Sequence, residues 1–402
     1  MIWGTVALLW ITYLLNYVDR QVVFSMFPVL KTDLGFSDTQ LGLIGSVFTW
    51  VYSLCMVLSG RAADLFRRDR LIIGSLLLWS VATLGTSASH SVSSFLSWRA
   101  VMGITESVYV PAALSLIASL HGPATRSRAL GIHMTAQIAG IAAGGWYGGW
   151  AADHIGWRSG FAVLAVVGIV YAVVLVLSFR AIPETKSDRE SKPAFAARVF
   201  DSICYNGLLL AFFAYCVMLW MIYAWLPTFI YEHYRLSMTE SGLAATIYLQ
   251  ASTAIGALTG GFVADRAVVR LRAARFYLVA GGVLLSAPFA WLAFQSDSLA
   301  VLKLASIGFG FFGGWLMANI FAAAYDVIAR ENYGLGAGAL NLCGGLAGGT
   351  AIFIAGYFKA SVGIAPLMLA ASAVSVASGI LLIVITRFRF PKQDASAMGY
   401  AS

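Results

Sequence analysis

Apolar stretches of about twenty residues, the length that spans a bilayer as a helix, recur along the whole chain. We identify twelve, near residues 2–27, 40–60, 71–89, 95–118, 129–151, 160–180, 200–230, 241–264, 276–295, 299–323, 334–357 and 362–386. Hydrophobic residues make up 60% of the 402 positions and charged residues only 11%, which excludes an ordinary soluble domain. The sequence therefore predicts an all-α membrane protein with twelve transmembrane helices. We expect no cleaved secretory signal, because the first stretch carries polar residues and no small-residue cleavage site.

The net charge of +8 is spread unevenly over the connections between these stretches. If successive helices alternate in direction, nineteen of the 26 Lys and Arg lie on the side of the N-terminus and five on the other, while Arg20 and Arg99 lie inside helices. This bias is the positive-inside pattern, which places both termini in the cytoplasm. A nucleic-acid-binding protein would gather its basic residues on one soluble face, and the sequence offers none. We predict a monomeric integral protein of the bacterial inner (plasma) membrane, surrounded by lipid.

The sequence indicates neither a metal site nor an enzyme active site. The cysteines lie in apolar stretches without paired spacing, and we interpret them as buried small residues: Cys55, Cys204, Cys216 and Cys343. The five histidines are scattered, and His133 in the fifth helix either lines a transport path or makes an interhelical hydrogen bond. There is no G-x-S-x-G, no Ser/His/Asp set at one depth and no large polar loop to hold a soluble active site. We expect no cofactor.

The chain divides into two similar halves. The interval from Ile182 to Arg198 is short, charged and contains prolines near both ends, which is typical of a linker, and six apolar stretches lie on each side of it. Motifs recur at nearly the same offset, with G-x-x-x-D at 60–64 and 261–265 and glycine-rich runs at 144–150 and 344–349. Such a repeat predicts two six-helix bundles with a substrate site between them near the midplane. We expect bundles at 1–181 and 199–390, a cytoplasmic linker at 182–198 and a cytoplasmic tail at 391–402.

The motif that follows the second helix resembles the signature loop of the major facilitator superfamily, and its second copy lies where that superfamily repeats it. The resemblance covers essentially the whole chain and implies the major facilitator fold and alternating access. Arg67 stands where a Gly is common, and Val268 and Val269 separate the basic residues of the second copy. We expect the glycines to let helices approach closely and the acids to accept hydrogen bonds from arginines; alternatively, the acids only mark helix ends. The predicted gating residues are Gly60, Asp64, Arg68, Gly261, Asp265 and Arg266.

Two acids and two arginines lie inside predicted helices of the first half. A charge at bilayer depth is costly unless it is paired or hydrated, so such residues usually lie on a substrate or proton path. Arg99 and Glu106 are seven residues apart and share a helix face. Because the first and fourth helices run in opposite directions, we expect a crossed arrangement, with Asp19 beside Arg99. Arg20 is then close to Glu106. These groups either exchange protons during transport or form static ion pairs that hold the bundle together.

The same residues resemble a narrower group, the anion:cation symporter family, which includes galactonate and hexuronate proton symporters and the sialic-acid and vesicular glutamate carriers. The resemblance rests on Asn16-Tyr-Val-Asp-Arg20 and on Arg99-Ala-Val-Met-Gly-Ile-Thr-Glu106. In the sugar-acid members an Arg, a Tyr and a Gln bind the substrate, which implies that role for Arg20, Tyr52 and Gln137. The resemblance also implies that Asp19 and Glu106 take protons. The run VYVPAA after Ser107 departs from the family pattern, which leaves the substrate's identity open.

Other polar side chains are candidates for the same path. Arg20 carries the planar fork that binds a carboxylate bidentately, and Tyr13 and Tyr17 share its helix face. Each tyrosine, tryptophan or amide has an alternative role in packing or interhelical bonding. The predicted substrate ligands besides Arg20 are Tyr17, Tyr52, Tyr109, Gln137, Trp220, Gln250, Asn319 and Asn341, with Tyr223 beside Trp220.

We therefore predict proton-coupled symport of an organic anion, a sugar acid such as a hexuronate or aldonate, with Asp19, Glu106 and Arg99 in the proton-coupling set. One rival within the fold is a Spinster-like lipid or lysolipid carrier, since such carriers share an Asp-Arg in helix one and a Gly-x-x-Glu in helix four. An apolar substrate path would favour that rival. The rival from another class, an intramembrane enzyme, would change its substrate chemically.

Overall fold

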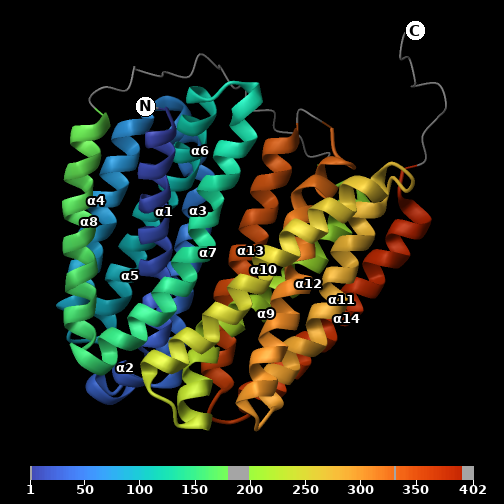
Figure 1. Cartoon of the computed structure of the whole chain (residues 1–402). Coiled ribbons are helices and arrows are strands. Elements are labelled where there is room, and N and C mark those ends of the chain that lie inside the picture. Colours follow the sequence, from blue (N-terminus) through green and yellow to red (C-terminus); the bar gives the residue numbers. More distant parts are fainter. Residues whose placement is uncertain (1, 180–198, 330–331, 392–402) are drawn as a thin grey trace.

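The structure, a computed structural model, describes residues 2–179, 199–329 and 332–391, and these ranges are helical almost throughout, with no strand (Figure 1). The predicted linker at 182–198 and nearly all of the predicted tail lie outside them. The helices are α1 (Ile2–Ser25), α2 (Phe27–Leu34), α3 (Asp38–Leu65), α4 (Arg68–Ser87), α5 (Val92–Ser107), α6 (Tyr109–Leu120), α7 (Pro123–His154), α8 (Trp157–Phe179), α9 (Ile203–Tyr234), α10 (Met238–Val268), α11 (Ala274–Gln295), α12 (Leu299–Tyr325), α13 (Tyr333–Phe358) and α14 (Ile364–Arg389).

Within the described residues, ten segments are long and apolar enough to cross a membrane, one of them formed by α5 and α6 together. Helices α1 and α7 are comparable in length, with 24 and 32 residues, but they carry more polar residues. The all-helical membrane fold is confirmed. The count of twelve spans is consistent with these helices and stays a prediction.

One predicted helix ends, and another is interrupted, just before a proline. The first predicted helix, at 2–27, ends at Met26, two residues before Pro28, and the short helix α2 follows. The fourth breaks at Val108, three residues before Pro111. A proline inside a helix has no N–H to donate and clashes with the carbonyl four residues earlier, which favours a break at both places. Proline alone does not force one, because α9 and α11 continue through Pro227 and Pro288. The second break lies directly after Glu106 and Ser107.

The internal repeat reappears as two matching corners, 200 residues apart. Gly35 closes α2 and Arg235 closes α9, and both adopt the left-handed conformation, with φ of 64° and 58°. Two residues later, Ser37 and Ser237 begin α3 and α10 with complete capping boxes, in which the serine and the residue three positions on bond each other's backbone. Corresponding helices of the two halves thus enter the bundle in the same way.

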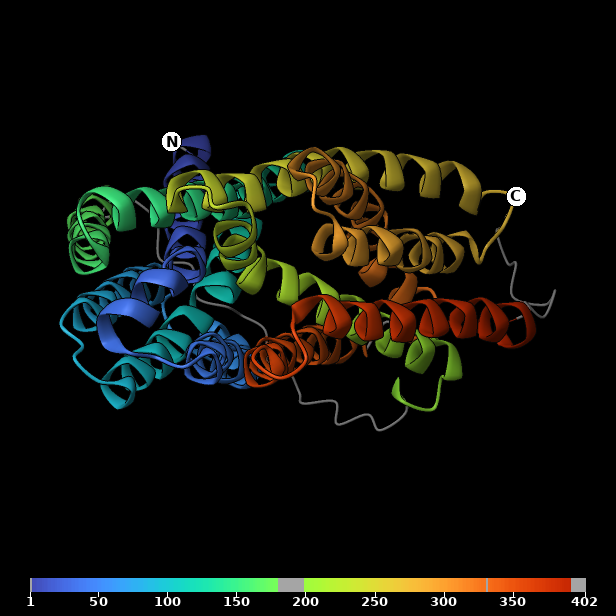
Figure 2. The same ribbon diagram turned by 90° about the horizontal axis from the view of Figure 1, so that it is seen from below.

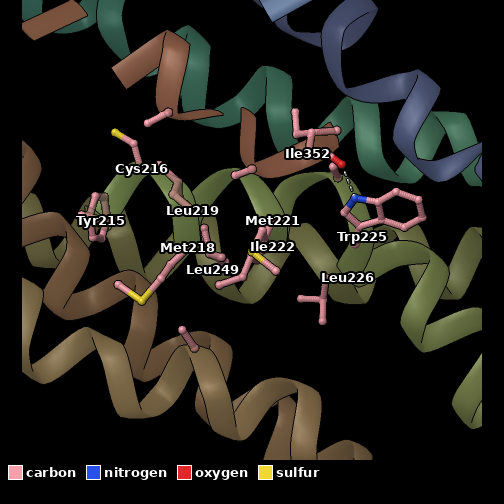
Figure 3. Packing of buried hydrophobic residues seen from close by; sticks show 14 of the residues in the cluster. Tyr215, Cys216, Met218, Leu219, Met221, Ile222, Trp225, Leu226, Leu249 and Ile352 are labelled. Atoms are coloured by element: carbon pink, nitrogen blue, oxygen red, sulfur yellow. Dashed lines mark hydrogen bonds between the residues drawn. The ribbon is translucent and has the colours of Figure 1, made fainter. Parts of the chain in front are cut away.

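Helices α1–α8 form one group and α9–α14 the other, and the described ends of α1 and α14 lie at the same end of the molecule (Figure 1). We call this the terminal end and the other the opposite end. Helix α9 is the centre of the second group, and its buried side chains pack against neighbouring helices on several sides (Figure 3). Trp225 on α9 donates from its indole N–H to the carbonyl of Ile352 on α13 at 3.2 Å.

Helices α3 and α13 join the two groups toward the opposite end, where they lie side by side (Figure 2). The hydroxyl of Ser46 donates to the carbonyl of Gly349 at 2.6 Å. At the outer limit of this contact, the Lys359 ammonium reaches Asp38 at 3.3 Å and Glu232 at 2.7 Å. Lys359 therefore ties the start of α3 to α9 and α13.

Helices α7 and α10 make the second connection at the same end. Asp153, near the end of α7, accepts hydrogen bonds from the backbone N–H of Thr239 at 2.7 Å and from its hydroxyl at 2.6 Å. The N–H of Met238 also reaches this carboxylate at 3.3 Å. A carboxylate of one half thus caps the first turn of a helix in the other, where free N–H groups and the helix dipole favour negative charge.

Neither connection extends to the terminal end. Along α3 the contact with α13 reaches Ser53, which lies against Gly345, and beyond it Leu58 is 71% exposed. On α10, Leu258 is 77% exposed. The two groups are therefore closed against each other at the opposite end and apart at the terminal end.

Glycines of α7 allow its close packing on two sides. A methyl group at Gly144 would lie 2.9 Å from the Val18 carbonyl oxygen of α1, and one at Gly145 would lie 2.7 Å from the Gly242 carbonyl oxygen of α10. Small residues at such spacing let helices approach to backbone contact within a membrane. One face of α7 is thus fixed to its own half, and the adjacent face belongs to the closed contact between the halves.

Candidate functional site

The charged centre of the first half lies where α1, α3 and α5 meet. Arg20 on α1 donates from Nε to Oε2 of Glu106 on α5 at 2.7 Å, and the two side chains are 7% and 0% exposed. The predicted proximity of this pair is confirmed. Gly103 makes it possible, because a methyl group there would lie 2.9 Å from the Phe48 carbonyl oxygen of α3, so α5 could not pack so closely. Removing one partner of such a pair would leave a buried charge uncompensated.

Three aromatic rings surround the Arg20 guanidinium. Its Cζ lies 4.0 Å from the ring centre of Tyr52, 4.8 Å from that of Tyr17 and 5.3 Å from that of Phe48. Ring faces stabilise a cation without neutralising it. Nη2 of Arg20 is buried and makes no hydrogen bond within the described residues, so one donor of the guanidinium is unused.

Asp19 and Arg99 do not form the predicted ion pair in the described residues. Asp19 interacts electrostatically with Glu106 and Arg99, but no nitrogen–oxygen distance of 4.0 Å or less joins it to Arg99. The reason is that the Arg99 guanidinium lies 4.5 Å from the Phe48 ring centre and donates to the Met102 sulfur at 3.2 Å. Both charged residues are buried, Arg99 completely, so the four charges form one compact group with a single direct contact.

A second polar group extends from Arg20 toward the terminal end along α1 and α7. The hydroxyl of Tyr13 donates to Oε1 of Gln137 at 3.4 Å, and the Tyr13 ring meets Tyr17 edge-on at 5.1 Å. Tyr13 also stacks on His133 at 4.8 Å. His133 is fully buried, and neither ring nitrogen makes a hydrogen bond within the described residues, so the expected interhelical bond is not seen.

Tyr109 is already engaged by the backbone and by neighbouring rings. Its hydroxyl donates to the Leu9 carbonyl at 2.6 Å, its side chain is fully buried, and its ring meets Trp79 edge-on. A phenol already bonded to backbone and enclosed by aromatic rings has little left to offer a ligand. Tyr109 therefore has the alternative, packing role in this conformation.

The second half faces the centre with neutral polar groups. Gln250 on α10 donates from its amide to the Tyr223 hydroxyl at 2.9 Å, and Trp220 meets the Tyr223 ring edge-on at 5.9 Å. Gln21 on α1 donates to the Tyr223 carbonyl at 3.1 Å across the boundary between the halves. Gln21 and Phe48 were not predicted as site residues. Their positions in the sequence could have identified them, since Gln21 follows Arg20 and Phe48 lies one helical turn before Tyr52.

Two predicted ligands of the second half lie elsewhere. The Asn319 amide donates to the Gly260 carbonyl at 3.3 Å and to the Trp315 carbonyl at 2.9 Å, so it holds α12 to α10. Asn341 is exposed, and its amide donates to Ala337 within its own helix at 3.0 Å. Neither contact is directed at the charged centre.

The glycines of the repeated G-x-x-x-D motif have open surroundings. A methyl group at Gly60 or at Gly261 would meet no atom within 4 Å among the described residues, so the prediction that they permit close helix approach is wrong for this conformation. Both lie near the terminal end, where the halves are apart. The side chain of Asp64 lies outside the described part of the structure.

In the second copy of the motif, the neighbouring arginine bonds a different acid. Arg275 contacts Asp326 at 2.9 Å but approaches Asp265 only to 4.0 Å, which is too long for a hydrogen bond. The expected hydrogen bond to the motif acid is therefore not seen among the described residues. Arg266 stacks on Phe262, with Cζ 3.4 Å from the ring centre. In the first copy, Nε of Arg68 is buried without a partner in the described residues.

The sequence profile of the Major Facilitator Superfamily matches residues 9–352 and 208–399. The chain belongs to the Major Facilitator Superfamily. It is a membrane transporter and not an enzyme. Within the described residues, no three His, Cys, Asp or Glu side chains gather to hold a metal ion.

Several superfamily members are similar over almost the full length. A D-galactonate transporter of Escherichia coli O6:H1 is 23% identical, covering 95% of this chain and 94% of its own. A probable galactarate/D-glucarate transporter of Bacillus subtilis (strain 168) is 25% identical, covering 98% and 94%. Among solved structures, a bacterial homologue of the human lysosomal transporter Spinster, in an inward-facing and occupied conformation, has a TM-score of 0.77 at 20% identity and covers 95% of both chains. At that identity the likeness shows the fold alone.

Proposed function

We propose that this chain takes up an organic anion with one carboxylate, a sugar acid such as a hexuronate or aldonate, together with protons. The observation that carries the proposal is the Arg20–Glu106 contact at 2.7 Å, made while Nη2 of Arg20 stays unused. A guanidinium in this state holds one acid and keeps a donor for the carboxylate of a substrate that enters together with a proton.

Coupling follows from competition for Arg20. When Glu106 is ionised, it is the partner of Arg20, and a second carboxylate entering the site would meet its negative charge. When Glu106 is protonated, Arg20 is left without a counter-charge and attracts the carboxylate of the substrate. Proton binding and anion binding therefore favour each other, and the two release together.

The charge distribution favours a substrate with a single negative charge. Among the described residues, every buried Asp, Glu, Lys or Arg belongs to the first half: Asp19, Arg20, Arg99 and Glu106. The second half contributes amides and hydroxyls, including Gln250 and Tyr223. We infer that the carboxylate binds Arg20 and the hydroxyl-bearing end points toward α9 and α10. A second carboxylate at that end would find no buried cation.

The side to which this conformation opens follows from the expected topology. With both termini in the cytoplasm of a bacterial cell, the closed opposite end faces the periplasm, and the conformation is inward-facing. Alternating access would then break the contacts of Asp153 and Lys359 and bring the glycines Gly60 and Gly261 toward the other half. We propose that the two halves, at 1–181 and 199–390, are the bodies that move, in a monomer.

The relatives named for galactonate and for galactarate/D-glucarate support a sugar acid, and the relative from Cupriavidus necator, 27% identical over 89% of this chain, is named a probable sulfoacetate transporter. The lipid alternative rests on a fold resemblance to the Spinster homologue. The polar pair of Gln250 and Tyr223 opposite Arg20 favours the hydroxylated substrate.

The test is binding followed by transport. Purified protein is heated with galactonate, glucuronate, galactarate or lysophosphatidylcholine, since a ligand of the folded state raises the melting temperature. We expect monocarboxylate sugar acids to stabilise most and galactarate much less. Liposomes containing the protein should then accumulate the stabilising anion only when their interior is alkaline. Stabilisation by the lysolipid alone would overturn the proposal.

A further inference from the structure

Helix α9 contains a proline in its interior, at Pro227. A proline has no N–H, so it cannot donate to the carbonyl four residues earlier in the helix. That carbonyl belongs to Tyr223, one of the polar residues that the second half directs at the charged centre. In a membrane helix, a carbonyl released by proline is satisfied by neighbouring groups. Tyr223 therefore offers a backbone acceptor that an unbroken helix would not have.

The donor for this carbonyl comes from the other half of the molecule. Gln21 on α1 donates from its amide to the Tyr223 carbonyl oxygen at 3.1 Å. Gln21 is 3% exposed and lies against α7, where a methyl group at Gly144 would be 2.9 Å from its Cβ. The base of the Gln21 side chain is thus packed within its own half while its amide reaches the second half.

Tyr223 is held at both of its ends. Its carbonyl accepts from Gln21, and its phenol oxygen accepts from the amide of Gln250 on α10 at 2.9 Å. The phenol also interacts electrostatically with that of Tyr17, whose ring centre lies 4.8 Å from Cζ of Arg20. Since Arg20 directly precedes Gln21 in α1, this hydrogen bond fixes the polar groups of the second half relative to the guanidinium.

We propose that Gln21 is a positioning residue that sets the spacing between the two ends of the substrate site, and that Pro227 makes its acceptor available. This inference rests on the proposed function, in which Arg20 binds the carboxylate and the second half binds the hydroxyl-bearing end. A substrate that spans both ends gains from a fixed spacing, because it does not have to align the two halves itself. A short acid that reaches only Arg20 gains nothing. Gln21 therefore selects for sugar acids long enough to reach α9 and α10.

A purely structural role for this hydrogen bond makes a different prediction. If the bond only holds α1 against α9, its loss weakens the binding of long and short acids alike, through the folding or the opening of the protein. If the bond sets the spacing, its loss weakens the binding of the long acid alone. The ratio of the two affinities separates the two roles.

The experiment measures binding of two acids to the purified full chain. Galactonate is a long sugar acid, titrated calorimetrically, and glycerate is a short acid with the carboxylate and the nearest hydroxyls, measured by its competition with galactonate. Gln21→Met should weaken galactonate binding about fivefold, the loss that corresponds to one hydrogen bond, and leave glycerate binding unchanged. Pro227→Ala gives α9 an N–H for the Tyr223 carbonyl, so it displaces Gln21 and should cause the same selective loss.

The double variant tests whether the two residues act through one bond. Gln21→Met combined with Pro227→Ala should weaken galactonate binding no further than either substitution alone, because both remove the same interaction. Pro288→Ala is the matched control, since Pro288 also lies inside a helix of the second half, α11, and it should leave both affinities unchanged. If Gln21→Met fails to fold, Pro227→Ala tests the bond from the acceptor side.

The results that overturn the inference differ from those that overturn the proposed function. Equal losses for both acids, an unchanged galactonate affinity, losses that add in the double variant, or glycerate that does not compete in the wild type each overturn the spacing role. A wild type that binds neither acid overturns the proposed function, and this inference with it.

Discussion

Replacing Arg20 by lysine should weaken binding of the transported anion by about 2 kcal/mol, or about thirtyfold in Kd. Arg20 holds Glu106 through Nε and keeps Nη2 for a second acid. Lysine retains the charge on one nitrogen, which cannot take both positions in a fixed plane. The charge-assisted bond that is lost is worth roughly 1.5–3 kcal/mol. Stacking on Tyr52, whose ring centre is 4.0 Å from Cζ, is lost as well.

The assay is calorimetric titration of the anion into wild type, Arg20→Lys and the control Arg387→Lys, all at one pH. Arg387 is exposed near the end of α14, so the same exchange there should leave Kd unchanged. If Arg20 only pairs with Glu106, Arg20→Lys will lower the melting temperature and leave Kd within about twofold. That outcome would refute the clamp.

Three further predictions concern coupling, gating and stability. Glu106→Gln should abolish accumulation driven by a pH gradient while sparing exchange of the anion across the membrane, as measured by liposome uptake. In the wild type, anion binding should tighten as the pH falls, because protonation of Glu106 frees Arg20. The variant should lose this pH dependence, which anion titrations at several pH values test. Asp153→Ala removes the cap on Thr239 and should shift the equilibrium toward opening of the opposite end by up to about fivefold, measured as labelling of a cysteine placed beneath the contact. Arg235→Gly should stabilise the fold by about 0.5–1 kcal/mol and so raise the melting temperature, because glycine accepts a φ of 58° without strain. An unchanged or lower melting temperature would show that the arginine is not strained there.

Much of the fold was predictable because bilayer thickness and helix geometry leave few alternatives. The apolar stretches locate the helices to within a few residues, and the register of seven between Arg99 and Glu106 placed Glu106 beside Arg20. The short helix α2 and the break before Pro111 were missed, although Pro28 and Pro111 are visible in the sequence, because a hydropathy window does not register a missing N–H. The matching corners were missed as well, since Arg235 does not look like a counterpart of Gly35.

The site was harder to predict where position depends on several helices at once. The helix register predicted the depth of Arg99 in the membrane. It could not predict that the guanidinium would lie against Phe48 and Met102 and form no ion pair with Asp19. Tyr109 and Asn319 are polar and lie within helices, and only the structure reveals that their side chains already donate hydrogen bonds to backbone carbonyls. Gly60 and Gly261 were assigned to close packing from their motif, and they are open because the halves are apart at that end.

The two glycine faces of α7 imply that similar substitutions on one helix should have different phenotypes. The contact of Gly144 with α1 lies within a single half. If the halves move as rigid bodies, as we propose, this contact persists through the cycle, so a methyl group there acts on folding and should reduce the yield of protein. The contact of Gly145 with α10 joins the two halves, and the same motion would break it when the opposite end opens. A methyl group at Gly145 penalises that half of the cycle alone, so it should leave abundance intact and change the ratio of import rate to export rate. Substitutions at two adjacent positions on α7 would thus affect different properties, one the amount of folded transporter and the other the ratio of import to export rates.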